Sequence, residues 1–333
     1  MVFRTALLLG DAAGIGPEIV AKLLAGGDLD PAFETTVIGD PRVLERGAAI
    51  AGVALGLPVV PSLDGAPVAG RTVLVQGPPL DPAEVPVGQL SEIAGREVLD
   101  TFRMALGLVQ KRAVDAICFA PCNKQAMHLG GLELEDEHRF FVDVLGFPGY
   151  VGEVNALERL ATTRVTSHVP LRAVADLITG DGIVHAARLA HDTLRATGSP
   201  HPRIAVCGLN PHAGDGGIFG REEIEVIAPA IERVRAEQIA ASGPYPADTV
   251  FVRAQAGEFD AVVTMYHDQG QIAMKLMGFE RGITISGGLP VPIATPAHGT
   301  AFDIAGRGIA RVDALRNAYR TACRMARARR SAS

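Results

Sequence analysis

The stretch RIAVCGLNPHAGDGGIFGREEIEVIAPAIERVRAE, residues 203–237, contains the unit from which the fold can be predicted. It opens with an unbroken apolar run at 203–209, passes through a glycine-rich loop and ends in a helical pattern at 222–237. An apolar run without alternation is typical of a strand that is buried on both faces of a parallel sheet. The stretch therefore predicts a strand–loop–helix unit, and its glycines let the loop bend sharply and approach a bound molecule closely.

The same alternation of strand and helix patterns recurs along the chain. Further apolar runs rich in Val, Ile, Leu and Ala lie at 5–10, 33–39, 72–76, 115–120 and 260–266. Further helical patterns lie at 17–26, 91–112, 169–178, 182–198 and 311–327. This order predicts an α/β fold with mostly parallel sheets covered by helices.

The composition excludes several classes of protein. The 333 residues are 48% hydrophobic and carry a formal net charge of −6, so no electrostatic footprint for nucleic acid is present. No apolar run approaches 18 residues, and the N-terminal apolar run is too short for a signal peptide. Four cysteines without zinc or redox spacing predict reduced thiols. We expect a soluble cytoplasmic protein that binds neither membrane nor nucleic acid.

The segment GDAAGIGPEI, residues 10–19, follows the first predicted strand and opens a helix. Pro17 suits the first helical position, and Glu18 suits the positive end of the helix dipole. The glycine spacing is not that of a Rossmann fingerprint, and no Walker lysine–serine pair follows. Two interpretations stay open, a tight strand-to-helix turn or a backbone cradle for part of a ligand.

Three histidines share one setting in the sequence. His168, His212 and His267 each lie a few residues beyond an extended segment, where ligands bind in open α/β sheets. Together they can supply three neutral nitrogen ligands to a divalent cation and leave positions open for substrate oxygens. The alternative is three loop histidines with separate hydrogen bonds.

Two other segments are candidates for binding. Lys275 lies shortly after His267 and could pair with a carboxylate or phosphate, or relay protons, although a surface lysine is the alternative. The glycine-rich segment PAHGTAFDIAGRG, residues 296–308, is typical of a shaped loop that holds a planar or polar ligand.

With these motifs in this order, the sequence resembles the 4-hydroxythreonine-4-phosphate dehydrogenase (PdxA-type) family over nearly its whole length. The segments that carry the resemblance are GDAAGIGPEI, LNPHAGDGGIFGREE, PADTVF, MYHDQG, KLMGFERG and HGTAFDIAGRG. That family is similar in architecture to isocitrate and isopropylmalate dehydrogenases. The resemblance implies two α/β domains with the active site in the cleft between them. We place the first domain, with the cofactor loop, at 1–125 plus 290–333 and the second, with the metal histidines and dimer interface, at 126–289.

The resemblance also implies an activity. The family oxidises the secondary alcohol of a small hydroxy acid with NAD or NADP and a divalent metal such as Zn, Mg, Mn or Co, often with decarboxylation of the β-keto acid. His168, His212 and His267 fall on the metal-ligand positions. In the family one of these ligands comes from the partner subunit, which implies a homodimer with shared active sites.

Further positions follow from the same resemblance. His138 and Lys275 fall on substrate-contacting positions, whereas Asp248 and Asp268, near the metal histidines in sequence, could orient them or move protons. These two aspartates, with Lys275, are the candidate catalytic residues. The candidate cofactor-binding residues are Gly14, His298, Gly299, Thr300 and Asp303.

The sequence departs from the family pattern at substrate positions. Arg139 replaces a threonine, Thr284 replaces an asparagine and Ile293 replaces an arginine, while Ala12 stands where proline is usual. Loss of a cationic fork at 293 predicts weaker binding of a phosphorylated substrate, although Arg139 could restore one anion contact.

The sequence therefore favours an unphosphorylated substrate, such as a diol carboxylate of the terephthalate dihydrodiol type. The alternative is a phosphorylated one, such as 4-phosphohydroxy-L-threonine or threonate or erythronate 4-phosphate. A non-catalytic ligand-binding homologue and a non-redox metal hydrolase are further alternatives.

Overall fold

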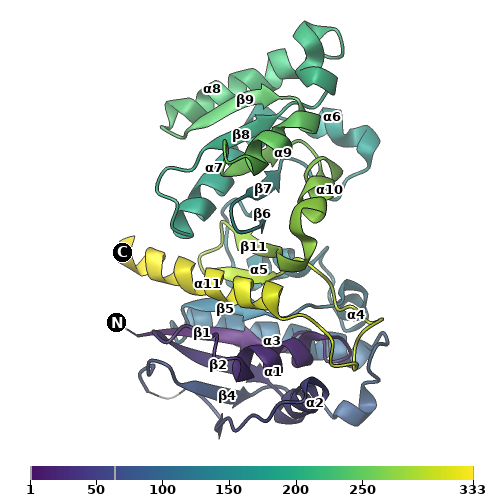
Figure 1. Cartoon of the computed structure of the whole chain (residues 1–333), viewed down its shortest axis with the longest axis vertical. Helices are drawn as coiled ribbons and strands as arrows, with labels where there is room; N and C mark the ends of the chain where they lie inside the picture. The colour runs from purple at the N-terminus through teal and green to yellow at the C-terminus, as the bar shows by residue number, and fades with distance from the viewer. Residues whose placement is uncertain (1, 64, 333) are drawn as a thin grey trace. The chain divides into compact units, whose positions relative to one another are not determined.

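The computed structural model describes residues 2–63 and 65–332, and the chain forms two compact units. The first unit comprises Met1–Pro148 and Leu289–Ser333, and the second comprises Gly149–Gly288. Figure 1 shows that both units combine a central sheet with helices. The predicted α/β class with mostly parallel sheets is confirmed.

The sheet of the first unit is entirely parallel. Its strands lie in the order β3-β4-β2-β1-β5-β12. Their bounds are Phe3–Leu8 (β1), Phe33–Gly39 (β2), Val59–Val60 (β3), Thr72–Gln76 (β4), Ala116–Phe119 (β5) and Ile293–Pro296 (β12). Strands β1, β2 and β5 are buried at every residue, including the polar residues Arg4 of β1 and Glu34 of β2, whose side chains form an ion pair.

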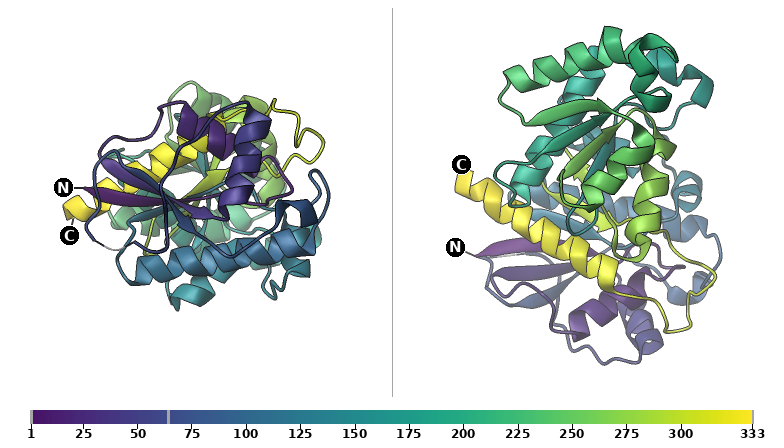
Figure 2. Two further views of the ribbon diagram at one scale, coloured as in Figure 1. Left: turned by 90° about the horizontal axis from the view of Figure 1, so that it is seen from below. Right: turned by 45° about the horizontal axis from the view of Figure 1, so that its top comes forward.

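Helices cover both faces of this sheet. Figure 2 shows α3 on one face, with α1 and α11 on the other. The bounds are Gly16–Ala25 (α1), Pro41–Ala51 (α2), Pro82–Glu84 (η1), Glu92–Gln110 (α3), Lys124–Leu129 (α4), Glu137–Leu145 (α5) and Asp313–Ala332 (α11). Side-chain oxygens of Asp40, Ser91 and Asp136 accept hydrogen bonds from backbone N–H groups in the first turns of α2, α3 and α5, which fixes where these helices begin.

The sheet of the second unit is mixed. Its strands lie in the order β11-β6-β7-β10-β8-β9, and β6 runs antiparallel to both of its neighbours. Strands β7, β10, β8 and β9 are mutually parallel. The bounds are Gly152–Ala156 (β6), Ala161–Arg164 (β7), Ile204–Cys207 (β8), Ala241–Tyr245 (β9), Ala261–Thr264 (β10) and Ile283–Gly287 (β11).

Helices α9 and α10 pack against β8 and β10 of the second unit through a cluster of buried apolar side chains, among them Val250, Phe251, Val262 and Met274. The helical bounds are Leu171–Ala173 (η2), Val174–Leu177 (α6), Gly180–Ala196 (α7), Pro211–Gly217 (η3), Glu223–Ile227 (η4), Ala228–Ala236 (α8), Ala247–Gln255 (α9), His267–Gly278 (α10) and Phe279–Arg281 (η5).

The boundary between the units differs from the expected one at residue 125. Helices α4 and α5 belong to the first unit because α5 packs on α3, with the rings of Phe102 and Phe141 4.9 Å apart between centroids. The return of the chain to the first unit, at Leu289, lies next to the expected position of 290.

Two expectations drawn from composition can be compared with the described residues. No helix among residues 2–63 and 65–332 is long and apolar enough to cross a membrane. All four cysteines have free thiols, and Cys118, Cys207 and Cys323 are buried.

Two carboxyl groups of the first unit are buried, that of Asp11 in the loop after β1 and that of Glu97 on α3. Burial raises the pKa of Asp11 to about 6, although the backbone N–H of Ala13 donates a hydrogen bond of 2.8 Å to its Oδ1. Burial raises the pKa of Glu97, on α3, to about 8, although the Thr101 hydroxyl donates to its Oε1 at 3.0 Å. A buried carboxyl with a raised pKa stabilises the fold at low pH, and that stability is lost as pH rises through the folded-state pKa.

Replacing Glu97 by Gln is expected to remove part of this pH dependence. The wild-type free energy of unfolding should fall between pH 4.5 and 8 because the folded state holds the Glu97 proton more tightly. At pH 8 the Glu97→Gln variant should be more stable than wild type by roughly 2–4 kcal/mol, with little difference at pH 4.5. Urea unfolding at the two pH values measures this, and Glu92→Gln, an exposed position on the same helix, is the control. If the unfolding free energies of wild type and Glu97→Gln change in parallel with pH, the pKa of Glu97 is not raised in the folded state.

Candidate metal and dinucleotide site

The three candidate metal histidines follow three neighbouring parallel strands. His168 lies shortly after β7, His267 begins α10 after β10, and His212 lies in η3 after β8. Strand β10 pairs with β7 on one side and with β8 on the other. The carboxyl ends of all three strands therefore meet at one edge of the second sheet.

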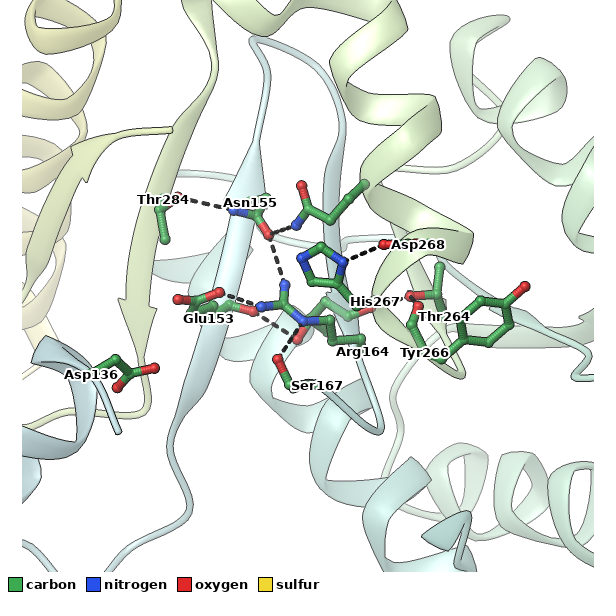
Figure 3. Close-up of polar contacts among 12 residues, drawn as sticks. Asp136, Glu153, Asn155, Arg164, Ser167, Thr264, Tyr266, His267, Asp268 and Thr284 are labelled. Carbon is green, nitrogen blue, oxygen red and sulfur yellow. Dashed lines mark hydrogen bonds and ion pairs between the residues drawn. The ribbon is translucent and has the colours of Figure 1, made fainter. Parts of the chain in front are cut away.

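The structure brings two of these histidines together. The rings of His168 and His267 lie 5.9 Å apart between centroids. Nδ1 of His267 lies 2.6 Å from Oδ1 of Asp268, which fixes the ring and leaves Nε2 available (Figure 3). A carboxylate on the second ring nitrogen is the usual support for a metal-binding histidine.

His212 is presented by a strained loop. Residues 212–217 all have positive φ, including the non-glycine residues His212, Ala213 and Asp215. Strain of this kind persists only where surrounding contacts hold it, and it gathers at functional sites. Among the described residues, the one recorded ring contact of His212 is with Phe219 at 6.2 Å. The loop therefore presents an exposed imidazole, and in the described part of the chain no group of three metal-binding side chains includes His212.

The buried carboxylate of Glu223 anchors the His212 loop. From the sequence alone, Glu223 could be placed only in the first turn of the helical pattern at 222–237. Oε1 of Glu223 accepts hydrogen bonds of 2.7 Å from the backbone N–H groups of Leu209 and Asn210. Oε2 accepts from Nδ2 of Asn210 at 3.0 Å. A Cβ on Gly214 would lie 2.7 Å from the same carboxylate, so glycine is required there.

The remaining candidates in the second unit lie on different elements. Lys275 is exposed on α10, eight residues after His267, and Asp248 is exposed in the first turn of α9. Thr284 is half-buried on β11, where its hydroxyl accepts a hydrogen bond from Nδ2 of Asn155 at 2.9 Å.

Sequence reasoning missed the polar network to which Asn155 belongs. Figure 3 shows Arg164 between Glu153, Asn155 and Ser167, with Asn155 next to Thr284. These residues occupy short strands and a loop in which polar side chains recur at every second position of β6. The alternation of polar residues in β6 could have indicated this network, because residues two apart in a strand lie on the same face of the sheet.

The substrate candidates of the first unit have different surroundings. His138 is buried on α5, and the neighbouring Arg139 is exposed at the start of that helix. Ile293 is 0% exposed in β12, which pairs with β5 and is covered by α11. Its assignment to the substrate site stays a prediction, and within this unit its side chain packs in the core.

The segment 296–308 packs against the turn at residues 10–16 in the first unit. The backbone N–H of Ile15 donates to the carbonyl of Thr300 at 3.1 Å, and a Cβ on Gly14 would lie 2.8 Å from Thr300 Cβ. Gly14 therefore allows the turn to pack closely against Thr300 of the loop. His298, Gly299 and Asp303 are half or fully exposed, so this part of the loop is accessible to a ligand.

An ion pair on α1 fixes the far end of the same loop. Nζ of Lys22 donates to Oε1 of Glu18 at 2.7 Å and to the carbonyls of Gly308 and Ala310 at 2.9 and 2.7 Å. Glu18 is buried and also accepts from the backbone N–H of Ala310 at 2.9 Å. Glu18 therefore lies in the first turn of α1, as the helix dipole favours, and its carboxylate also anchors the end of the loop directly.

Comparison with known proteins gives one family for the chain. Residues 32–322 match the family described as pyridoxal phosphate biosynthetic protein PdxA. A Pseudomonas aeruginosa protein provisionally named 4-hydroxythreonine-4-phosphate dehydrogenase 2 is 50% identical over 328 residues, which are 97% of each chain. The D-threonate 4-phosphate dehydrogenase of Cupriavidus necator is 39% identical over 321 residues, covering 96% of each chain.

Solved structures agree with this. The 4-hydroxythreonine-4-phosphate dehydrogenase of Klebsiella pneumoniae has a TM-score of 0.84 at 36% identity and covers 98% of each chain. The terephthalate 1,2-cis-dihydrodiol dehydrogenase of Burkholderia xenovorans has a TM-score of 0.67 at 29% identity, covering 97% of this chain and 98% of the other.

Removing the Glu223 carboxylate is expected to release the His212 loop. Glu223→Ala leaves the half-buried N–H groups of Leu209 and Asn210 without their acceptor, at a cost of about 1–3 kcal/mol in unfolding free energy. Hydrogen exchange should show lost protection over 209–217 before global unfolding. Glu225→Ala is the matched control, because Glu225 forms only an exposed ion pair with Arg221. Equal exchange in the two variants would show that Glu223 does not anchor the loop.

Proposed function

Because the chain belongs to the PdxA family, we propose that it is an NAD(P)-dependent dehydrogenase that oxidises the secondary alcohol of a small phosphorylated hydroxy acid. The family match spans most of the chain, and both relatives and the Klebsiella structure carry dehydrogenase names. The observation that carries the proposal within the chain is the pairing of His168 with His267 at the carboxyl ends of neighbouring strands.

The residues present fit a divalent cation. His168 and His267 would supply two imidazole nitrogens, and Asp268 already holds the second nitrogen of His267. His212 of the partner subunit would supply the third ligand, because no group of possible metal ligands among the described residues of one chain includes His212. The proposal therefore includes a homodimer with shared sites.

The residues of the 296–308 loop fit a dinucleotide. The loop presents His298, Gly299 and Asp303 to solvent, while Thr300 is held against the turn at Gly14. Its end is fixed by Lys22 and Glu18. A loop that is ordered before binding loses less conformational entropy when a ligand binds.

When bound, the cation would lower the pKa of the substrate hydroxyl as a Lewis acid, and NAD(P)+ would take up the hydride. The alcohol carbon thus loses a hydride and its oxygen loses a proton, giving a ketone, NAD(P)H and H+. Where a carboxylate lies β to the ketone, its carbon–carbon bond can break with release of carbon dioxide, and a proton then replaces the carboxylate. Lys275, Asp248 and Asp268 are the proposed groups for holding or moving these protons.

A phosphorylated substrate is favoured over the unphosphorylated diol carboxylate that the sequence favoured. The unphosphorylated substrate is predicted from the substitutions at 139, 284 and 293, and of these Ile293 is buried in the core of its unit. The relatives named for phosphorylated substrates are 39% to 50% identical, whereas the terephthalate dihydrodiol enzyme is 29% identical. Arg139 and Lys275 are the proposed cationic contacts.

An NAD(P)-reduction screen tests the proposal. The substrates are 4-phosphohydroxy-L-threonine, D-threonate 4-phosphate, D-threonate and the cis-dihydrodiol of terephthalate, each with NAD and NADP and with or without EDTA. We expect absorbance at 340 nm to rise with a phosphorylated substrate, with kcat/KM at least about tenfold above the unphosphorylated ones, and EDTA to abolish it. His212→Ala should lower turnover about 100-fold or more. His201→Ala, an exposed loop histidine, is the control.

Other outcomes would favour the alternatives. Turnover of the dihydrodiol and of none of the phosphorylated acids would indicate an unphosphorylated diol carboxylate as the substrate. Binding of ligands without any NAD(P)H would indicate a non-catalytic homologue, and metal-dependent hydrolysis would indicate a hydrolase.

A further inference from the structure

We infer that Asn155 is a positioning residue that commits the Thr284 hydroxyl to donate its hydrogen bond to an oxyanion of the substrate. The inference rests on the proposed function, since it concerns the substrate of that enzyme. Asn155 and Thr284 lie opposite one another on the antiparallel strands β6 and β11. Side chains of such a pair share one face of the sheet and interact directly.

Arg164 fixes the orientation of the Asn155 amide. The Arg164 side chain is 6% exposed, and its Nη1 donates to Oδ1 of Asn155 at 3.0 Å. A guanidinium carries only donors, so the Asn155 atom that faces it must be the amide oxygen. Nε2 of Gln271, on α10, donates to the same oxygen.

The guanidinium is itself held on two further sides. Its Nη2 pairs with Glu153, and its Nε donates to the Ser167 hydroxyl at 2.9 Å (Figure 3). Because all three nitrogens are engaged and the group is buried, rotation of Arg164 would break several charge-assisted hydrogen bonds. The amide orientation of Asn155 is therefore set by a rigid neighbour.

The donor end of the amide then fixes the role of Thr284. Nδ2 of Asn155 lies 2.9 Å from Oγ1 of Thr284, and an amide nitrogen can only donate. The Thr284 oxygen accepts this bond, so the hydroxyl proton is left for another acceptor. Among residues 2–63 and 65–332, no second hydrogen bond of this hydroxyl is recorded, and the side chain is half-buried.

The consequence is a preference for one substrate chemistry at this position. With one lone pair occupied by Asn155 and the proton turned away from the amide, the hydroxyl is oriented to donate to a carboxylate or phosphate oxygen. The network also joins Ser167, beside His168, to Gln271 on α10, the helix that begins at His267. Asn155 thus links the proposed substrate contact to the segments that carry His168 and His267.

A double-mutant cycle separates this role from general structural support. Asn155→Asp keeps an oxygen for Arg164 and Gln271 but turns the donor into an acceptor, so Thr284 must donate to it. Thr284→Val removes the hydroxyl. The measured quantities are KM, kcat and the calorimetric Kd of D-threonate 4-phosphate without NAD(P), so binding is read independently of turnover.

Each single variant should raise KM and Kd about tenfold with a smaller change in kcat. Thr284→Ser, which keeps the hydroxyl, should restore most of the binding that Thr284→Val loses. In the Thr284→Val background, Asn155→Asp should raise Kd by less than about twofold, because the hydroxyl it acts through is gone. The melting temperature and the Co2+ affinity of each variant, both measured by calorimetry, should stay near wild type.

Three results would overturn the inference. An equal effect of Asn155→Asp in both backgrounds would show that it acts by added charge alone. Unchanged Kd in Thr284→Val would show that the hydroxyl does not contact the substrate. If the wild-type protein neither binds nor oxidises D-threonate 4-phosphate or any other hydroxy acid in the screen, the proposed function and this inference are both wrong. If the wild-type protein turns over normally and the variants are unaffected, only this inference is wrong.

Discussion

Neighbouring parallel strands must end at the same edge of their sheet, and the site depends on this constraint. In the second unit β7, β10 and β8 lie side by side and parallel, so the segments after them are brought together whatever their separation in sequence. His168 and His267 are almost 100 residues apart in the chain, yet their rings lie 5.9 Å apart. The hydrogen bonds of the strand ladder supply this proximity before any ligand binds.

Loops at such an edge need anchors, and buried charged groups provide them here. Glu223 holds the strained loop of His212 through two backbone N–H groups, and Glu18 with Lys22 holds the end of the 296–308 loop. A buried charge is costly unless its hydrogen-bonding groups are satisfied, and these partners satisfy most of them. The same contacts that offset the cost of burial therefore keep the loops in the shape that a ligand would require.

Much of the fold could be predicted because most of its central strands coincide with segments rich in apolar residues. The runs at 33–39 and 72–76 coincide with β2 and β4, whereas β6, β7 and β11 contain Asn155, Thr162, Arg164 and Thr284 and have no continuous apolar signal. The apolar run at 260–266 predicts the strand end before His267, whereas His168 follows β7, for which the sequence offers only a polar extended segment. The roles of Glu223, Lys22 and Asn155 could not be predicted, because each depends on a partner supplied by tertiary packing. The burial of Ile293 could not be predicted either, because it depends on the packing of β12 between β5 and α11.

The central claim is that imidazoles from neighbouring strands, completed by the partner subunit, bind one divalent cation. Anomalous diffraction at the cobalt edge, from crystals grown with Co2+ and NAD, tests it most directly. The account predicts one strong peak per site within bonding distance of His168 and His267 of one chain and His212 of the partner subunit. A peak bound by other side chains, or no peak near His168 and His267, would contradict it.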